Sequence, residues 1–137
     1  MATLAHSRAE DLPPEGRRGG AVDPSPLVGT WLNTDRFSPG IVRVELALTD
    51  GGLTVHAFGA GEPSPIDWGV VPAEVYADGV ASTAPAGFSA HYDFGFLRVC
   101  LQGKTNRGVL VLALFNEFRD RSGRASWFNR EFYYHGL

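Results

Sequence analysis

The 137-residue chain contains one cysteine, one methionine and one lysine. With Cys100 alone no disulfide can form within the chain, which fits a reducing compartment, and its apolar neighbours predict a small buried side chain. No opening apolar stretch resembles a signal peptide, and no run approaches the roughly 20 apolar residues that a membrane span needs. We therefore expect a cytoplasmic protein with no membrane partner.

Motifs for metals, cofactors and nucleophilic catalysis are also missing. His6 and His135 lie near the ends of the chain, and His56 and His91 have no partners at ligand spacing, so no metal site is expected. The sequence holds no Gly-x-Ser-x-Gly, phosphate loop, dinucleotide fingerprint or Cys-x-x-Cys, so we expect no cofactor and no nucleophilic catalysis. The formal net charge is −3 and basic residues are not clustered, which argues against nucleic acid as a partner.

Helical periodicity is absent as well, and short alternating runs take its place. The 17 glycines, 9 prolines and the aromatic residues (3 Trp, 4 Tyr and 9 Phe) are spread over these runs and indicate an all-β protein. Eight strands joined mostly by hairpin-length turns predict an antiparallel up-and-down barrel, which encloses one small ligand and leaves no sheet edge exposed. A two-sheet sandwich is the alternative. The expected strands span residues 27–33, 41–48, 53–59, 70–77, 88–94, 96–102, 109–119 and 125–134.

Two segments lack the alternation of a strand. Residues 1–26 contain paired prolines and several glycines, which predict a flexible leader ahead of a single barrel domain at 27–137. Residues 60–69 contain two prolines, and proline cannot donate to a strand ladder. This second segment is therefore expected to be a loop at the mouth of the barrel.

Residues 41–59 form a predicted β-hairpin around which the other strands are arranged, because an Asp-Gly pair supplies the positive φ angles of a tight turn. One face of this hairpin is wholly apolar. The other sets Glu45 directly opposite His56, with Arg43 opposite Phe58. A carboxylate that orients an imidazole makes a general acid–base pair, so Glu45 and His56 are candidate catalytic residues if this face lines the lumen. On the outer wall the two residues would be an ordinary exposed cross-strand pair.

The run Gly-Thr-Trp-Leu-Asn at 29–33, with Arg130 near the end of the last strand, resembles the calycins, the group of lipocalins, fatty-acid-binding proteins and avidins. The resemblance implies that Trp31 closes the floor of the barrel and that Arg130 packs across its indole ring. The same run is similar to the start of avidins, which implies that Asn33 contacts a ligand. The tryptophan cage of avidins and the later lipocalin motifs are missing, so neither biotin nor a secreted-carrier role is implied.

Aromatic and amide side chains recur at positions that share one face of a strand, which is typical of a cavity for a flat, weakly charged organic ligand, although core packing also explains them. Asp67 and Trp68 on the mouth loop are expected to meet the ligand; a local turn and a plug of the barrel end are the alternatives. In the last hairpin, Asn116 is predicted opposite Asn129. The candidate ligand-binding residues are Asn33, Arg43, Phe58, Asp67, Trp68, Tyr92, Phe94, Asn116, Phe118 and Trp127.

These features predict a barrel that encloses a small hydrophobic or aromatic organic molecule and catalyses cofactor-free proton transfer on it. Cyclisation, isomerisation or dehydration of a natural-product intermediate fits best, because shape can hold a reactive conformer. The first alternative is a non-catalytic carrier or sequestration protein for the same kind of ligand. The second is a homodimer module, whose interface would be the aromatic outer face of the last strand at Phe128, Phe132 and Tyr134.

Overall fold

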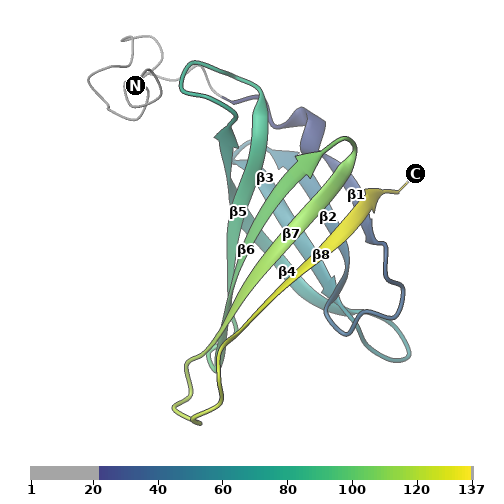
Figure 1. Ribbon diagram of the computed structural model, residues 1–137, viewed down its shortest axis with the longest axis vertical. Coiled ribbons are helices and arrows are strands. Elements are labelled where there is room, and N and C mark those ends of the chain that lie inside the picture. Colours follow the sequence, from purple (N-terminus) through teal and green to yellow (C-terminus); the bar gives the residue numbers. More distant parts are fainter. Residues whose placement is uncertain (1–21, 137) are drawn as a thin grey trace.

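The computed structural model describes residues 22–136, which form a closed barrel of eight antiparallel strands in chain order (Figure 1). The predicted all-β class and up-and-down topology are confirmed, and the two-sheet sandwich is excluded. Each strand pairs with its neighbours in the chain, and β1 pairs with β8 to close the sheet. The strands are β1 (Gly29–Asn33), β2 (Ile41–Thr49), β3 (Gly52–Gly59), β4 (Ile66–Ala77), β5 (Pro85–Asp93), β6 (Leu97–Asn106), β7 (Val109–Phe118) and β8 (Trp127–His135).

The predicted leader, residues 1–26, lies mostly outside the described residues. Near its end, Ser25–Leu27 form a short 3-10 helix, η2, whose Leu27 is buried. The backbone N–H of Asp23 donates to the carbonyl of Thr83 at 2.9 Å, so the first described residues are tied to the connection between β4 and β5.

No helix in residues 22–136 has the length and the apolar character required to cross a bilayer.

The hairpin of β2 and β3 has the predicted register. Glu45 lies opposite His56, and Arg43 lies opposite Phe58. Gly52, directly after the turn, adopts a φ of +112°, a conformation that glycine takes without strain. The short turn and the alternation on both sides of it leave a single way to pair the two strands.

The apolar face of this hairpin points into the barrel and its charged face points outward. Val44, Leu46 and Val55 are at most 2% exposed and belong to the central core. Burying each such side chain stabilises the fold by about 1.5–3 kcal/mol. Burying a charged group without a partner instead costs several kcal/mol. Of the two placements that the sequence left open for Glu45 and His56, the structure shows the second: both lie on the outer wall.

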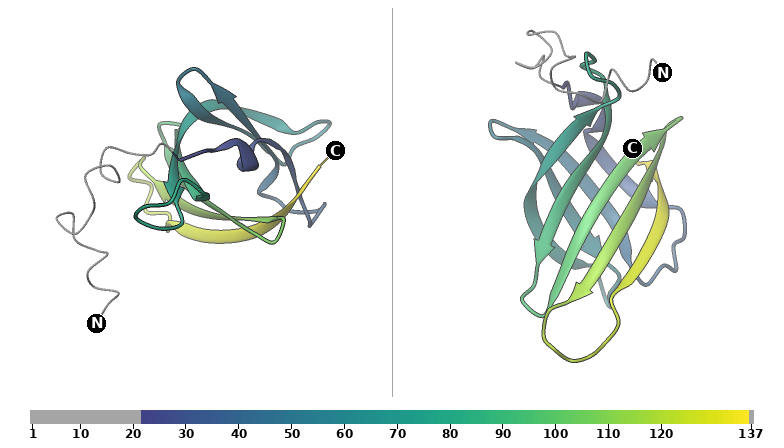
Figure 2. Two further views of the ribbon diagram at one scale, coloured as in Figure 1. Left: turned by 90° about the horizontal axis from the view of Figure 1, so that it is seen from above. Right: turned by 60° about the vertical axis from the view of Figure 1, so that its left-hand side comes forward.

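One end of the barrel is closed by η2, which lies across the opening in the view from above (Figure 2). The indole N–H of Trp31 donates to the carbonyl of Leu27 at 2.9 Å, and the ring stacks on His135 with the centroids 4.2 Å apart. Trp31 is 2% exposed and forms the floor at this end.

Arg130 does not pack across Trp31, as the calycin resemblance implied. It is exposed on the outer face of β8, opposite Ala113, and His135 occupies the position on the indole. The reason is strand alternation, because side chains five residues apart on one strand point to opposite faces.

The middle of the barrel is filled with side chains. Phe88 from β5 packs over Gly103 of β6, where an added Cβ would overlap the phenyl ring. Val99, Leu101 and Leu112 are completely buried around it. The interior space described below lies beyond this packed layer, at the end of the barrel opposite η2.

All eight strands lie where they were expected, with ends that differ by up to four residues; the start of β4 and the register of the last hairpin are the differences that affect the site. β4 begins at Ile66, so Asp67 and Trp68 lie on a strand and not on a loop. The strand extends this far because Gly69 adopts a φ of +87° and because the pairing with β3 is irregular at this point. In the last hairpin, Asn116 lies opposite Trp127 and not opposite Asn129. This register differs from the predicted one by two residues, which leaves every side chain on its predicted face.

Candidate ligand-binding site

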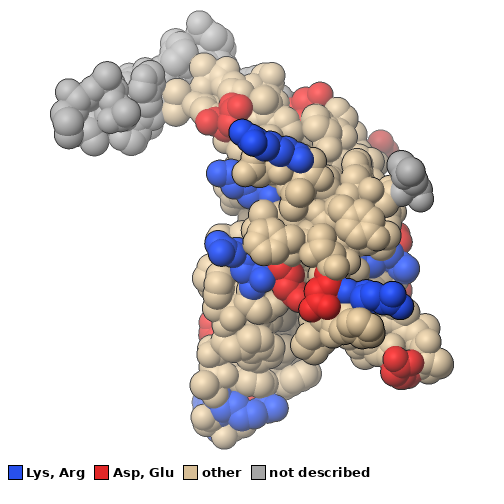
Figure 3. All heavy atoms as spheres, turned by 45° about the vertical axis from the view of Figure 1, so that its right-hand side comes forward, with Lys and Arg blue, Asp and Glu red and all other residues tan. Residues whose placement is uncertain are grey.

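A cavity of about 360 Å³ lies at the end of the barrel opposite η2. At this end the β7–β8 hairpin extends on one side and the loops at 34–40 and 60–65 extend on the other (Figure 1), and in the space-filling view the molecule divides into two arms (Figure 3). Residues from four strands and one loop form the wall. They are Pro39, Gly40, Trp68, Leu97, Leu114, Asn116, Trp127, Asn129 and Glu131.

Aromatic rings make the apolar side of this cavity. The Trp68 indole meets Tyr92 and Phe94 edge to face, with centroids 5.4 and 5.3 Å away. The Trp127 indole is tilted against Phe118 at 5.4 Å. Contacts of this kind favour one orientation of each ring, so both indoles are held as fixed apolar surfaces of the cavity wall.

Amide and carboxylate groups of β7 and β8 make the polar side. Nδ2 of Asn116 donates to Oδ1 of Asn129 at 2.8 Å and to the carbonyl of Trp127 at 3.2 Å. The hydroxyl of Ser38 donates to Oε1 of Glu131. The other carboxylate oxygen of Glu131, Oε2, is buried and has no hydrogen-bond partner. Leaving such an acceptor unpaired costs about 1–3 kcal/mol, so a donor brought to Oε2 would be stabilising.

Tyr133 and Asn33 lie deeper in the barrel than Glu131. The Tyr133 hydroxyl and Nδ2 of Asn33 donate to the same carbonyl, that of Ile41, at 2.7 and 2.9 Å. Burial and then the negative charge of Glu131 raise the pKa of Tyr133 far above its usual value, so the phenol stays protonated. Oδ1 of Asn33 accepts from the N–H of Asp35 at 2.8 Å. Asn33 thus fixes the start of the 34–40 loop and is not among the lining residues.

The candidate catalytic residues belong to a group on the outer wall, which we call the outer-wall group: Arg43, Glu45, His56, Phe58 and Asp67. Nε2 of His56 lies 2.7 Å from Oδ1 of Asp67, and the imidazole packs on Phe58 at 4.3 Å. Glu45 pairs with Arg43 at 3.2 Å, and the guanidinium lies 4.0 Å from the centre of the Phe58 ring. The Gly69 N–H, and then His56, lower the pKa of Asp67. The carboxylate bonded to the imidazole is therefore that of Asp67, not that of Glu45.

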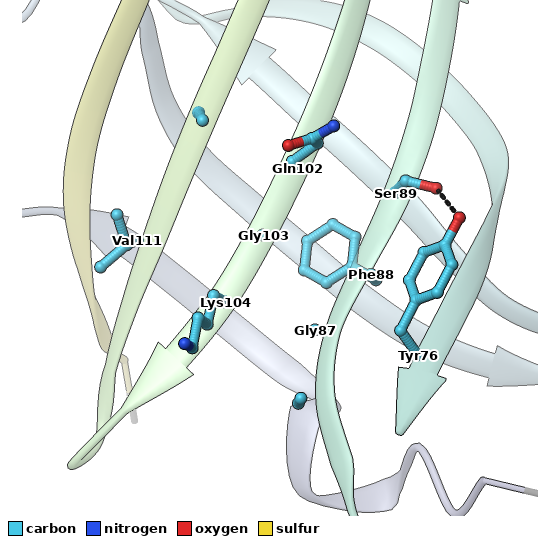
Figure 4. Close-up of a pocket in the computed structure, with 10 residues that line it drawn as sticks. Tyr76, Gly87, Phe88, Ser89, Gln102, Gly103, Lys104 and Val111 are labelled. Carbon is cyan, nitrogen blue, oxygen red and sulfur yellow. Dashed lines mark hydrogen bonds between the residues drawn. The ribbon is translucent and has the colours of Figure 1, made fainter. Parts of the chain in front are cut away.

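A hollow of about 420 Å³ lies on the outer wall over β5 and β6 (Figure 4). Gly87 lines it, and an added Cβ at this glycine would overlap the carbonyl oxygen of Gly103. The hydroxyls of Tyr76 and Ser89 are 3.1 Å apart on one side, and Lys104 lies on the other. A third hollow, of about 720 Å³, lies between the loops at 34–40 and 60–65. Neither contains a predicted site residue among its lining residues.

Most of the predicted ligand-binding residues gather at the open end. Those that line the cavity or contact one of its tryptophans are Trp68, Tyr92, Phe94, Asn116, Phe118 and Trp127. The three that lie in the outer-wall group are Arg43, Phe58 and Asp67. Asn33 is buried beneath the cavity.

The polar side of the cavity was predicted only in part, through Asn116. Asn129 and Glu131 were not among the candidates, although both share strand parity with Trp127 and Tyr133, which lie on the inner face. That alternation is the signal that identifies them. Pro39 and Gly40 gave no comparable signal, because a loop has no period from which a facing side can be inferred.

The described residues show neither a single charged patch on the face of Figure 3 nor a metal-binding cluster. On the face shown in Figure 3, Lys and Arg are interspersed with Asp and Glu and form no single patch. Among residues 22–136, no group of three His, Cys, Asp or Glu side chains is placed to hold a metal ion.

No family model matches the chain, and no curated protein or solved structure is significantly similar to it. The closed eight-stranded barrel is compatible with a calycin-like fold.

Proposed function

We propose that this barrel binds one small organic molecule, largely aromatic or apolar, in the cavity lined by Trp68 and Trp127. The observation that carries the proposal is the contrast between the two ends. One end is closed by η2 and followed by a packed core, whereas two indoles and a few polar groups converge on a cavity at the other. Small-molecule sites are typically concave and mostly apolar, with a small number of placed polar groups.

The size of the cavity limits the ligand. A volume of about 360 Å³ is near the lower end of the range of about 300–1,000 Å³ for ligand pockets, which suits a molecule of one or two fused rings. The indoles supply flat apolar contact, and the amides of Asn116 and Asn129 supply hydrogen bonds to a polar substituent.

Binding without turnover is the function that the geometry supports best. Glu45 and His56, from which proton transfer was expected, line none of the three cavities described above. A carrier or sequestering protein needs no proton donor, and the aromatic wall accounts for its affinity.

Acid–base catalysis is the second candidate, and the 2.7 Å contact between His56 and Asp67 favours it. A carboxylate on one imidazole nitrogen fixes the tautomer and leaves the other nitrogen to move a substrate proton. Such a protein would catalyse cofactor-free cyclisation, isomerisation or dehydration of a natural-product intermediate at the outer-wall group. A candidate compound recovered chemically changed, with turnover abolished by His56→Ala and by Asp67→Asn, would support this candidate over the carrier.

The binding proposal is tested with N-phenyl-1-naphthylamine, a neutral aromatic probe whose fluorescence rises in apolar surroundings. When the probe is titrated into the wild-type protein, its fluorescence should rise and then saturate at one equivalent. Trp127→Leu should weaken binding by about tenfold, because it removes part of the apolar wall. Phe128→Leu is the matched control, since this neighbouring side chain lies on the outer face. Equal affinity of the two variants, or no saturable binding by the wild type, would contradict the proposal.

A further inference from the structure

Glu131 brings a carboxylate to the inner face of β8. Its position follows from strand alternation, since Asn129 and Tyr133 on either side of it also point inward. Oε1 is bonded by the Ser38 hydroxyl, and Oε2 is buried without a partner. An acidic side chain on the inner face of a barrel therefore ends beside the candidate cavity with half of its acceptor capacity unused.

Among the described residues, no positive charge balances this carboxylate. The residues that line the cavity include neither lysine nor arginine. Within residues 22–136, the ion pairs join other acidic side chains, and Glu131 takes part in none of them. A carboxylate removed from water is costly unless it is paired with a cation or fully hydrogen-bonded.

We infer that the cavity selects molecules that join an aromatic or apolar body to a protonated amine, with the ammonium group at Glu131. This inference rests on the proposed function. An ammonium group supplies the missing charge and a donor for Oε2, in a charge-assisted hydrogen bond that is stronger than a neutral one. The indoles of Trp68 and Trp127 suit the same ligand, because aromatic faces attract cations as well as apolar rings.

Gly40 lies close against the carboxylate. An added Cβ at this position would lie 2.9 Å from Oε2 of Glu131, so a larger residue would force the carboxylate to move. The terminal torsion of a glutamate side chain is soft, and a small rotation is enough to turn Oε2 toward the cavity. The loop and the strand thus hold the acidic group at the boundary of the cavity.

The inference is tested with three probes that share one indole body: tryptamine, 3-propylindole and indole-3-propionate. Each is titrated against bound N-phenyl-1-naphthylamine at neutral pH. Tryptamine should bind about tenfold or more tightly than 3-propylindole, and indole-3-propionate should bind most weakly. Glu131→Gln should remove the preference for the amine, so that this variant binds tryptamine and 3-propylindole with equal affinity. Glu117→Gln, at an exposed carboxylate on the outer face of β7, is the matched control and should keep the preference.

The outcomes separate the inference from the proposed function. If the three indoles bind equally well, or if Glu131→Gln keeps the preference for tryptamine, the inference is overturned while the binding function stands. If neither the naphthylamine nor any indole binds, the proposed function fails as well. The comparison of the three probes uses the wild-type protein, so it decides the matter even if Glu131→Gln does not fold.

Discussion

His135 stacks on Trp31 across the pairing of β1 and β8, with the rings 4.2 Å apart and inclined by 10°. This contact lies where the last strand meets the first, so it joins the two ends of the sheet. Nε2 of His135 also lies 3.2 Å from the carbonyl of Val28. Gly29 provides the room for the imidazole, because a Cβ there would overlap the ring. The closure of the barrel depends on this glycine as well as on the two rings.

Gly29→Ala is expected to lower the free energy of unfolding by about 2–3 kcal/mol, because the methyl group displaces His135 and because a φ of +139° is strained for alanine. Urea denaturation followed by tryptophan fluorescence measures the change. Gly79→Ala is the matched control, since a Cβ at this glycine meets nothing within 4 Å. Equal stability of the two variants would show that the seam tolerates a side chain.

Phe88 and Gly103 form a second size-matched pair, in the packed middle of the barrel. Gly103→Ala is expected to destabilise the protein by about 1–3 kcal/mol through overpacking. Phe88→Leu leaves a cavity and is also destabilising. The double variant should lose less than the sum of the two, because the smaller side chain accommodates the added methyl. Urea denaturation of the wild type, the two single variants and the double variant gives the four free energies of this double-mutant cycle. If the two single changes add to within about 0.5 kcal/mol of the double change, the side chain of Phe88 does not contact Gly103.

Tyr92 and Tyr133 make the barrel sensitive to alkali. Burial raises the pKa of both phenols above the usual value of 10.0. Because the unfolded chain ionises first, the stability that these groups contribute is complete below pH 10.0 and is lost as the pH rises further. The urea midpoint should therefore fall on going from below to above that pH, and Tyr133→Phe should lessen the fall. Tyr134→Phe, on the outer face, is the control and should fall as the wild type does.

The two predicted hairpins show what the alternation of side chains along a strand predicts and what it does not. For residues 41–59 a tight Asp-Gly turn fixed the register, and each predicted pair was confirmed. For the last hairpin the longer connection at 119–126 permits registers two residues apart, which place the same side chains inside. The face of Asn116 and Trp127 was therefore predictable, while their partners across the strands were not.

The loop contact that holds Glu131 in place lay beyond such reasoning. Ser38 and Glu131 are 93 residues apart in the chain and meet because a loop folds back over the end of the barrel. No local pattern in residues 34–40 specifies that contact. The partner of Trp31 was within reach, since alternation along the last strand places His135, and not Arg130, on the inner face.

Aromatic side chains also cover the outer face of β7 and β8, as the dimer hypothesis required. Phe115 lies opposite Phe128, and Val111 lies opposite Phe132. The aromatic residues of this face are 45–56% exposed; they are Phe115, Phe128, Phe132 and Tyr134. Contiguous exposed apolar surface of this kind is typical of an interaction site.

We expect two barrels to associate through this face. Sedimentation velocity over a range of concentrations should show a reversible dimer for the wild type, because association removes the exposed rings from water. The double variant Phe128→Ser with Phe132→Ser should remain monomeric under the same conditions. Leu48→Ser with Val70→Ser is the matched control, since these side chains are 53% and 59% exposed but lie on β2 and β4, which pair with neither β7 nor β8. A wild-type protein that sediments as a monomer at every concentration would contradict the dimer, and a control variant that dissociates as readily as the first would assign the interface elsewhere.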